Sequence, residues 1–463
     1  MRNLLVPSIV IVVAFGGGPA GSSARAQSPA TGGQETAPGV VRLTLDAAIG
    51  RAYQASHRLG EARAREESAR ATLAGRQAAD LPQMSVLAGY TRTNHVTPFA
   101  ITFPLRPPEV IYPDLPDNYR ARFDVQWPIY TFGRTAAVER AAAAEVEAVV
   151  KDGETVRADV KLEVTRAFWG VVTARESVRV LEESLRRMDA SLLDVQNRLK
   201  NGLVPPSDVL SVQAQRSRQL MLLIQARNQA DVVTADLARL VGAPPGTVVE
   251  PDATLEPPPP ATQAAPSPGD EAKIRAFVVQ AKGARPEREA LVRRAAEAGQ
   301  RREAAAASTR PLLGVNGGVD YARPNPRIFP RVGEFKYSWD ASVNFSWLLW
   351  DGGRAKADLA EATASARAVG ERLAEFDSAI EVEVRQRWLD VASSQAAVAA
   401  ATDAVAAAAE ARRVLGERFA AGVATSTDVL DAQVALLQAE LDRTGALTNL
   451  RLAEARLDRA IGR

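Results

Sequence analysis

The sequence contains no cysteine and only two histidines, His57 and His95, among 463 residues. The absence of cysteine excludes disulfide bonds, thiolate metal sites, thiol nucleophiles and a lipid carried on a cysteine. Two histidines that lie 38 residues apart are too few to suggest a histidine-based metal cluster or an ordinary Ser/His/Asp triad. No phosphate loop of the form GxxxxGK[ST] and no His/Asp/Glu cluster at ligand spacing is found. The sequence therefore predicts no enzyme, no metal site and no cofactor.

The sequence also lacks an excess of positive or negative charge, and it lacks long apolar runs. Lys and Arg (57) nearly balance Asp and Glu (55), so a nucleic-acid partner is not expected. Beyond the N-terminus no stretch approaches the roughly 18 uninterrupted apolar residues that a membrane-spanning helix needs.

The N-terminus has the pattern of a secretory signal. Arg2 precedes an apolar run from Leu4 to Phe15, and Ala24-Arg25-Ala26 resembles a cleavage site. We predict a signal peptide over 1–26 and a flexible segment over 27–42, with a short uncleaved anchor as the alternative. The mature chain is then exported.

The chain is a tandem duplication with an offset of 220 positions. WPIYTFGR at 127–134 matches WLLWDGGR at 347–354, and RLKNGLVPPSDVL at 198–210 matches RFAAGVATSTDVL at 418–430. The two repeats are predicted at 43–242 and 271–463. The intervening 243–270 is rich in proline and predicts an extended linker.

Each repeat is predicted to contain a long helical hairpin. Proline is absent over 135–204 and from 331 onward, and apolar residues follow a heptad pattern over 164–199 and, more loosely, over 384–419. The pattern continues after a turn near 202–208 or 422–428. We expect antiparallel coiled-coil hairpins at 134–241 and 354–461, whose first arm of about 65 residues would be about 100 Å long.

Each repeat also has an aromatic window that predicts a strand pair, at about 83–130 and 312–350. The two windows 81–134 and 311–350 hold 17 of the 25 aromatic residues. Over 118–127 and 338–347 apolar residues alternate strictly with polar ones, which places one sheet face in an apolar medium and the other in water. The upstream partner strands, at 84–92 and 312–321, show a weaker pattern. The alternating aromatic residues, which we expect to face lipid, are Tyr119, Phe123, Trp127, Trp339, Phe345 and Trp347.

Two interpretations of these strands remain open. They could be soluble hairpins that pack on a core. The signal peptide and the aromatic residues at strand ends favour an outer-membrane barrel instead. Four strands cannot close a barrel and open edges are not tolerated in lipid, so several chains would have to contribute to one barrel.

With the duplication, the strand windows and the two RxxxG…DVL motifs established, the chain resembles the TolC-like outer-membrane efflux proteins. The opening LTLDAAIGRAYQ at 43–54 and RPE at 285–287 add to the resemblance, which covers nearly the whole mature chain. It implies a homotrimer whose twelve strands form a barrel in outer-membrane lipid and whose twelve helices form a periplasmic tunnel. It also implies a passive exit duct of a tripartite efflux or type I secretion system, docked to a periplasmic adaptor and an inner-membrane transporter.

The hairpin tips hold the candidate functional residues. Gly202 and Gly422 are placed to end the first arms in the left-handed cap conformation. An oxygen side chain, Ser207 or Thr427, is expected at the N-cap of each return helix. Asp208 and Asp428 would add a carboxylate near the positive end of the helix dipole.

Arg198 and Arg418 precede the tip glycines by one turn. Each could merely stabilise a helix C-terminus. The resemblance implies that both RxxxG tips, Arg198 to Gly202 and Arg418 to Gly422, contact the adaptor. The two prolines at 205 and 206 stiffen the first tip, so the two tips are not expected to contact it identically.

The resemblance also implies an acidic ring at the periplasmic entrance, formed by Asp428 and Asp431. Such a ring would attract cations. For Asp428 the alternative is simple capping, and for Asp431 it is a solvated helix surface.

A different class of function, a periplasmic coiled-coil scaffold or adaptor, stays open as the alternative. An adaptor should carry a single hairpin flanked by lipoyl-like and β-barrel segments, whereas this sequence has two hairpins with interposed aromatic strands.

Overall fold

The structure is a computed structural model that describes residues 39–104, 106–256 and 268–463. The predicted signal peptide, most of the predicted N-terminal flexible segment and the middle of the predicted linker lie outside these residues.

Four helices form two hairpins of equal size. The first consists of α3 (Arg134–Lys200) and α4 (Pro206–Leu240), and the second of α7 (Arg354–Ala420) and α8 (Ser426–Ala460). Both first arms have 67 residues and both return arms have 35, and corresponding residues lie 220 positions apart. The predicted duplication of long helical hairpins is therefore confirmed.

Four shorter helices accompany the hairpins. They are α1 (Leu45–Ala55), α2 (His57–Gln77), α5 (Pro268–Ala284) and α6 (Pro286–Ala306). The helix α2 packs on α3, and α6 packs against both α3 and α7. Corresponding residues of α2 and α6 lie 229 positions apart, and each helix ends in one 3₁₀ turn, at Ala78–Asp80 or Ala307–Thr309.

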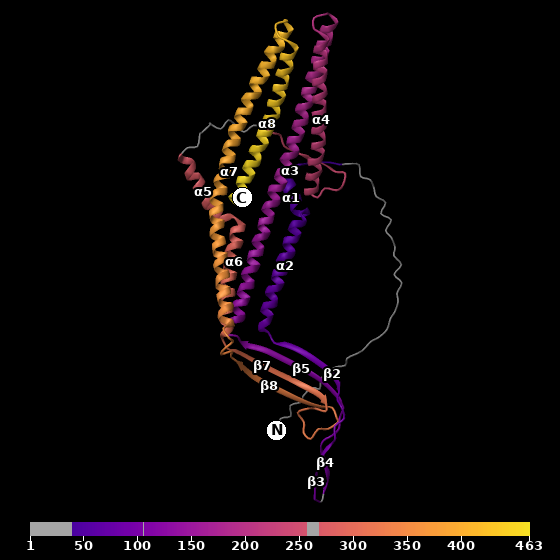
Figure 1. The fold of residues 1–463 in the computed structure, drawn as a ribbon, viewed down its shortest axis with the longest axis vertical. Helices are drawn as coiled ribbons and strands as arrows, with labels where there is room; N and C mark the ends of the chain where they lie inside the picture. The colour runs from indigo at the N-terminus through magenta and orange to yellow at the C-terminus, as the bar shows by residue number, and fades with distance from the viewer. Residues whose placement is uncertain (1–38, 105, 257–267) are drawn as a thin grey trace, which may run out of the picture. The chain divides into compact units, whose positions relative to one another are not determined.

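The strands of the two aromatic windows form one antiparallel sheet. Its members are β2 (Gln83–Arg92), β5 (Asp117–Tyr130), β7 (Leu312–Arg323) and β8 (Lys336–Ser346), in the order β2-β5-β7-β8. Figure 1 shows how β5 and β8 lead into α3 and α7. A separate hairpin of β3 (Phe99–Phe103) and β4 (Arg106–Tyr112) lies in the β2–β5 connection, where no strand was predicted.

The helices pack side by side in a fixed order. The helix α3 contacts α4 and α8, and α8 contacts α7, which gives the order α4-α3-α8-α7. The edges of this layer are therefore α4, from the first repeat, and α7, from the second. The sheet likewise has a first-repeat strand, β2, at one edge and a second-repeat strand, β8, at the other.

The predicted linker is partly wrong. Its residues Val248–Pro251 form β6, which pairs in parallel with β1 (Val40–Leu43) from the segment predicted to be flexible. Val249 is fully buried in a core with Phe168 and Leu237. Val249, which follows the prolines at 244 and 245, packs its side chain between α3 and α4, and the average composition of the segment conceals this apolar contact.

None of the helices among the described residues is long and apolar enough to cross a membrane.

Candidate functional site

Both first arms end in the same glycine turn. Gly202 has φ of 71° and Gly422 has φ of 77°, in the left-handed region that favours glycine. The N–H of Leu203 donates to the carbonyl of Arg198 over 2.9 Å, and that of Val423 donates to the carbonyl of Arg418 over 2.8 Å. These bonds form Schellman motifs, which satisfy the last carbonyls of α3 and α7.

The predicted N-caps at the tips are wrong by two residues. The N-cap of α4 is Pro205, which has no capping side chain, and that of α8 is Thr425. Ser207 and Thr427 lie inside the first turn instead. In α4, Pro206 occupies the first helical position, where its missing N–H costs nothing. In α8, Thr425 and Asp428 form a capping box in which the N–H of Asp428 donates to Thr425 Oγ1 and the N–H of Thr425 donates to Asp428 Oδ2.

The two acidic residues predicted to form a ring lie one turn apart on α8. Both Asp428 and Asp431 are exposed. The backbone N–H and the hydroxyl of Thr425 hold the pKa of Asp428 below its usual value. Asp428 therefore caps its own helix.

The two tips of one chain contact each other directly. Ser426 Oγ donates to Asp208 Oδ2 over 2.6 Å. Arg198 donates to the carbonyl of Phe419 over 3.3 Å, and its guanidinium lies 4.5 Å from the centre of the Phe419 ring. We call these contacts the in-chain tip joint. Arg198 is thus engaged by the second hairpin as well as by Asp194, 3.0 Å away.

The sheet has one apolar and one charged face, because its register aligns the alternating residues of all four strands. Tyr90 pairs with Tyr119, Phe123 with Val319, and Val319 with Trp339. The aromatic residues predicted to face lipid are all exposed in the single chain, namely Tyr119, Phe123, Trp127, Trp339, Phe345 and Trp347.

The opposite face holds an ion-pair network that the sequence did not reveal. Arg122 donates to Asp124 over 2.7 Å and to Asp340 over 3.0 Å, and it also contacts Asp320. Arg120 donates to Asp320 over 2.5 Å, and Asp320 is only 2% exposed. Because β5 belongs to the first repeat and β7 and β8 to the second, this network joins the two repeats. The alternation marked these residues as polar, but their partners depend on a register between distant strands.

One tryptophan per repeat fixes the junction of helix and strand. The indole N–H of Trp127 donates to the carbonyl of Asp80 over 3.0 Å, and that of Trp347 donates to the carbonyl of Thr309 over 3.0 Å. Both acceptors lie in the 3₁₀ turns that end α2 and α6. Each tryptophan therefore ties the end of one strand to the start of its neighbour.

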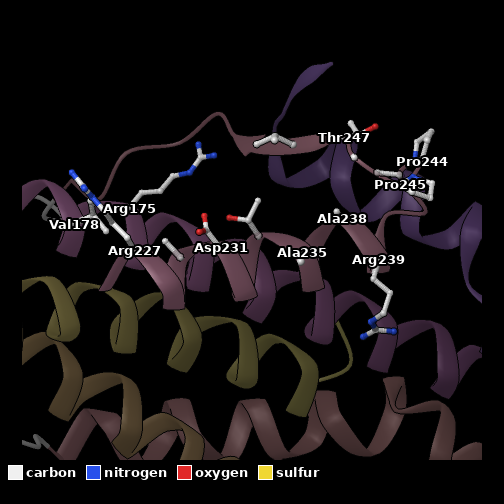
Figure 2. A pocket seen from close by; sticks show the side chains of 15 residues that line it. Arg175, Val178, Arg227, Asp231, Ala235, Ala238, Arg239, Pro244, Pro245 and Thr247 are labelled. Carbon is white, nitrogen blue, oxygen red and sulfur yellow. The ribbon is translucent and has the colours of Figure 1, made fainter. Parts of the chain in front are cut away.

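A groove of about 670 Å³ lies beside α4 and the loop that leads to β6 (Figure 2). Small side chains such as Ala235 and Ala238 line it, together with Arg227 and Asp231. Arg227 is paired with Glu182, 2.7 Å away. The lining of the groove contains no histidine. Among the described residues no group of His, Asp and Glu could hold a metal ion.

Comparison with known proteins is consistent with this geometry. CyaE of Bordetella pertussis (strain Tohama I) is 28% identical over 123 residues, which are 27% of this chain and 26% of CyaE. The chain thus aligns with about a quarter of that relative. The crystal structure of CusC has a TM-score of 0.76 at 14% identity and covers 95% of this chain and 99% of CusC. The outer membrane protein VceC of Vibrio cholerae has a TM-score of 0.73 at 19% identity, with 90% and 96% covered.

The family model described as outer membrane efflux protein matches residues 48–243 and 280–463. These ranges include both hairpins, both tips and all four strands of the sheet. The chain therefore belongs to the outer membrane efflux protein family.

Proposed function

We propose that three copies of this chain form an outer-membrane exit duct. The observation that carries the proposal is a sheet with one aromatic and one charged face, whose edge strands β2 and β8 have no partner strand on their outer sides within the described residues. The sheet continues into a helix layer whose outer helices, α4 and α7, likewise have no neighbouring long helix on their outer sides in the described part of the chain. An exposed apolar face of this kind suits lipid, and a charged face suits a water-filled lumen.

The open edges support closure by copies of the same chain. In lipid the unpaired N–H and C=O groups of β2 and β8 must find partners. Pairing β8 of one copy with β2 of the next satisfies both edges and brings α7 beside α4 of that next copy. Such a head-to-tail contact generates a ring. Three copies then contribute twelve strands to the barrel and twelve long helices to a periplasmic tunnel.

The duct would work with other proteins. Its tips, which lie about 100 Å of helix away from the sheet, would reach a periplasmic adaptor and an inner-membrane transporter that supplies the energy. The exposed apolar residues Leu203 and Val423, beside the tip glycines, offer contact surface for the adaptor. Both efflux of small compounds and secretion of proteins are compatible with a passive duct.

Cell fractionation tests this function against the alternative of a soluble periplasmic scaffold or adaptor. We expect the full chain in the outer-membrane fraction, released only by detergent, and running on mild denaturing gels as a trimer that heating converts to monomer. A monomer released by osmotic shock without detergent would support the scaffold and contradict the duct.

The acidic positions give a second prediction. We expect Asp428→Asn combined with Asp431→Asn to lower the preference of the pore for cations and to weaken block by divalent cations, because a ring of carboxylates would be neutralised. Reversal potentials in planar bilayers measure the preference. Asp208→Asn is the matched control at the equivalent position of the first tip. Unchanged selectivity in the double variant would leave Asp428 as a helix cap only.

A further inference from the structure

A cleft of about 340 Å³ lies at the end of the sheet that is remote from the helices. The strands β2 and β7 begin just after the 3₁₀ turns that end α2 and α6, whereas β5 and β8 lead into α3 and α7. The connections at 93–116 and 324–335 therefore lie at the other end of the sheet, and the second of them borders the cleft. In the proposed duct this end is the outer mouth, an assignment that rests on the proposed function.

The charged face of the sheet forms the floor of the cleft. Gly89 of β2 pairs with Arg120 of β5, which pairs with Ala322 of β7. Side chains alternate between the two faces along a strand, so Arg120 and Ala322 share the face of Arg122 and its carboxylate partners. A Cβ at Gly89 would meet no atom within 4 Å, so the floor is open above this residue.

The connection between β7 and β8 forms one wall of the cleft. Its lining residues are Pro324, Pro326 and Arg331. Asn325, which is only 2% exposed, holds this connection against the start of β8, because its Nδ2 donates to the carbonyl of Lys336 over 2.9 Å. The wall is therefore built into the single chain and does not depend on a ligand.

Arg331 brings a fixed positive charge to this wall. Its Nη1 donates to the hydroxyl of Tyr112 over 2.8 Å, and its guanidinium lies 4.7 Å from the centre of the same ring. In the part of the chain that the structure describes, no carboxylate pairs with Arg331, and Glu334 of the same connection pairs with Lys336 instead. A half-buried guanidinium in this setting has further N–H groups to donate to an anion.

Arg120 brings a second positive charge to the floor. Its Nε and Nη2 donate to Asp320 over 2.5 and 3.1 Å, and 47% of its side chain is exposed. Asp320 is only 2% exposed and also contacts Arg122. The cleft therefore presents guanidinium groups, while the carboxylate that pairs with them is covered.

Leu87 gives the cleft an apolar side. It pairs with Arg122 in the register of the sheet and therefore lies on the charged face, yet it is 60% exposed. Together with Pro324 and Pro326 it lines the cleft opposite the polar groups. An apolar wall with a few fixed polar groups is typical of sites that bind small molecules.

Closure of the proposed ring leaves the cleft open. The in-chain registers show that β8 follows β5 by 220 positions and that β7 follows β2 by 229. The in-chain pair of Arg122 with Asp320 therefore corresponds to a pair of Ser342 with Thr91 of the next copy. A serine at this position adds a small hydroxyl beside the cleft and does not fill it.

We propose that this cleft binds amphipathic organic anions at the outer mouth of the duct. The ligand class is a small molecule that combines an apolar body with a carboxylate, sulfate or sulfonate group. Arg331 and Arg120 donate to the anionic group, and the apolar body lies against Leu87, Pro324 and Pro326. Both guanidiniums repel a cation of the same shape, so the site distinguishes the sign of the charge.

Calorimetry on the purified full chain in nonionic detergent tests the site. The probes are naphthalene sulfonate and, as a cation with the same ring system, naphthylmethylammonium. We expect the wild type to bind only the sulfonate. Arg331→Gln should weaken its binding by about tenfold or more, because charge-assisted hydrogen bonds are lost. Leu87→Asn should weaken it by about fivefold, because an apolar contact is lost.

Arg92→Gln is the matched control for the loss of one positive charge. Arg92 lies at the same end of the sheet and pairs with Asp117, 3.3 Å away, but it does not line the cleft. This variant should bind the sulfonate as tightly as the wild type does. Equal weakening in Arg92→Gln and Arg331→Gln would overturn the proposal, as would equal binding of the two probes by the wild type.

Planar bilayers show the effect of the bound anion on the duct. We expect naphthalene sulfonate to block conductance, and block of Arg331→Gln to need about tenfold more probe. Block from the helix side identifies exported cargo as the natural ligand, and block from the sheet side alone identifies an external compound; either result supports the site.

The two measurements separate this inference from the proposed function. All the lining residues belong to one chain, so binding does not require the ring. A wild-type chain that binds the sulfonate but forms no pore would overturn the proposed function and keep the ligand class of the cleft. A pore that the sulfonate neither binds nor blocks would overturn the site and keep the proposed function.

Discussion

Replacing Val343 by arginine is expected to abolish assembly of the chain in the outer membrane. Val343 lies in the middle of β8 on the aromatic face, pairs with Val315 and is exposed in the single chain. An arginine on the lipid face near the bilayer midplane costs about 2 to 4 kcal/mol in each chain. Because a trimer carries the substitution three times, we expect little or no heat-modifiable trimer in the outer-membrane fraction.

The adjacent residue provides a matched control. Ser342 precedes Val343 on the same strand, and its side chain therefore lies on the opposite, charged face. Ser342→Arg introduces the same side chain into the proposed lumen, where water can solvate it, and should assemble at close to wild-type levels. Equal assembly of both variants would show that the aromatic face does not contact lipid.

Removing Arg459 is expected to cause the second large effect, on stability. Arg459, near the end of α8, donates to Asp159 of α3 over 2.8 Å and contacts Glu287 of α6. Breaking a buried ion pair by deleting one partner typically costs about 3 to 5 kcal/mol of the free energy of unfolding, because the remaining charge stays buried. We expect Arg459→Met to lose stability near the lower end of this range, since Asp159 is partly exposed.

The equivalent residue of the first repeat, Arg239, is the control for Arg459. It is exposed and pairs with Asp236 on its own helix, a contact worth about 0 to 1 kcal/mol. Thermal unfolding in detergent, followed by far-ultraviolet circular dichroism, should therefore show a large shift for Arg459→Met and little for Arg239→Met. Equal shifts would mean that the ion pairs of Arg459 do not stabilise the junction of the repeats.

The same cluster predicts how this stability depends on pH. Burial by itself raises the pKa of Glu287, but the hydrogen bond from Arg459 and the nearby positive charges outweigh it and lower the pKa below its usual value. A lowered pKa in the folded state stabilises the protein above the pKa of the unfolded chain. This stabilisation is lost as the pH falls through the folded-state pKa. The difference between wild type and Arg459→Met should therefore narrow in acid.

Local patterns predicted the repeated elements because those elements depend on periodicity. The heptad positions of α3 and the alternation from Tyr119 to Trp127 arise from neighbours in the chain, so sequence alone revealed the helices, the strand windows and the duplication. The N-caps were missed by two residues because Pro206 is accepted in the first turn of α4 and Thr425, not Thr427, caps α8.

Contacts between distant segments could not be predicted in the same way. The pairing of β1 with β6 joins Val40 to Val248, and the network around Arg122 joins β5 to β7 and β8. Both depend on a register between segments about 200 residues apart, which no local pattern encodes. The in-chain tip joint was missed for the same reason, since Asp208 and Ser426 meet only after both hairpins have packed.

The central claim is that copies of the chain pair their edge strands with one another and enclose an aqueous passage. Electron cryo-microscopy of the purified assembly tests this claim most directly. The account predicts a ring of three copies in which β8 pairs with β2, and α7 packs on α4, of the next copy. The Arg122 network should face the continuous lumen. A monomer, or an assembly whose charged sheet face is buried and whose aromatic face lines the interior, would contradict it.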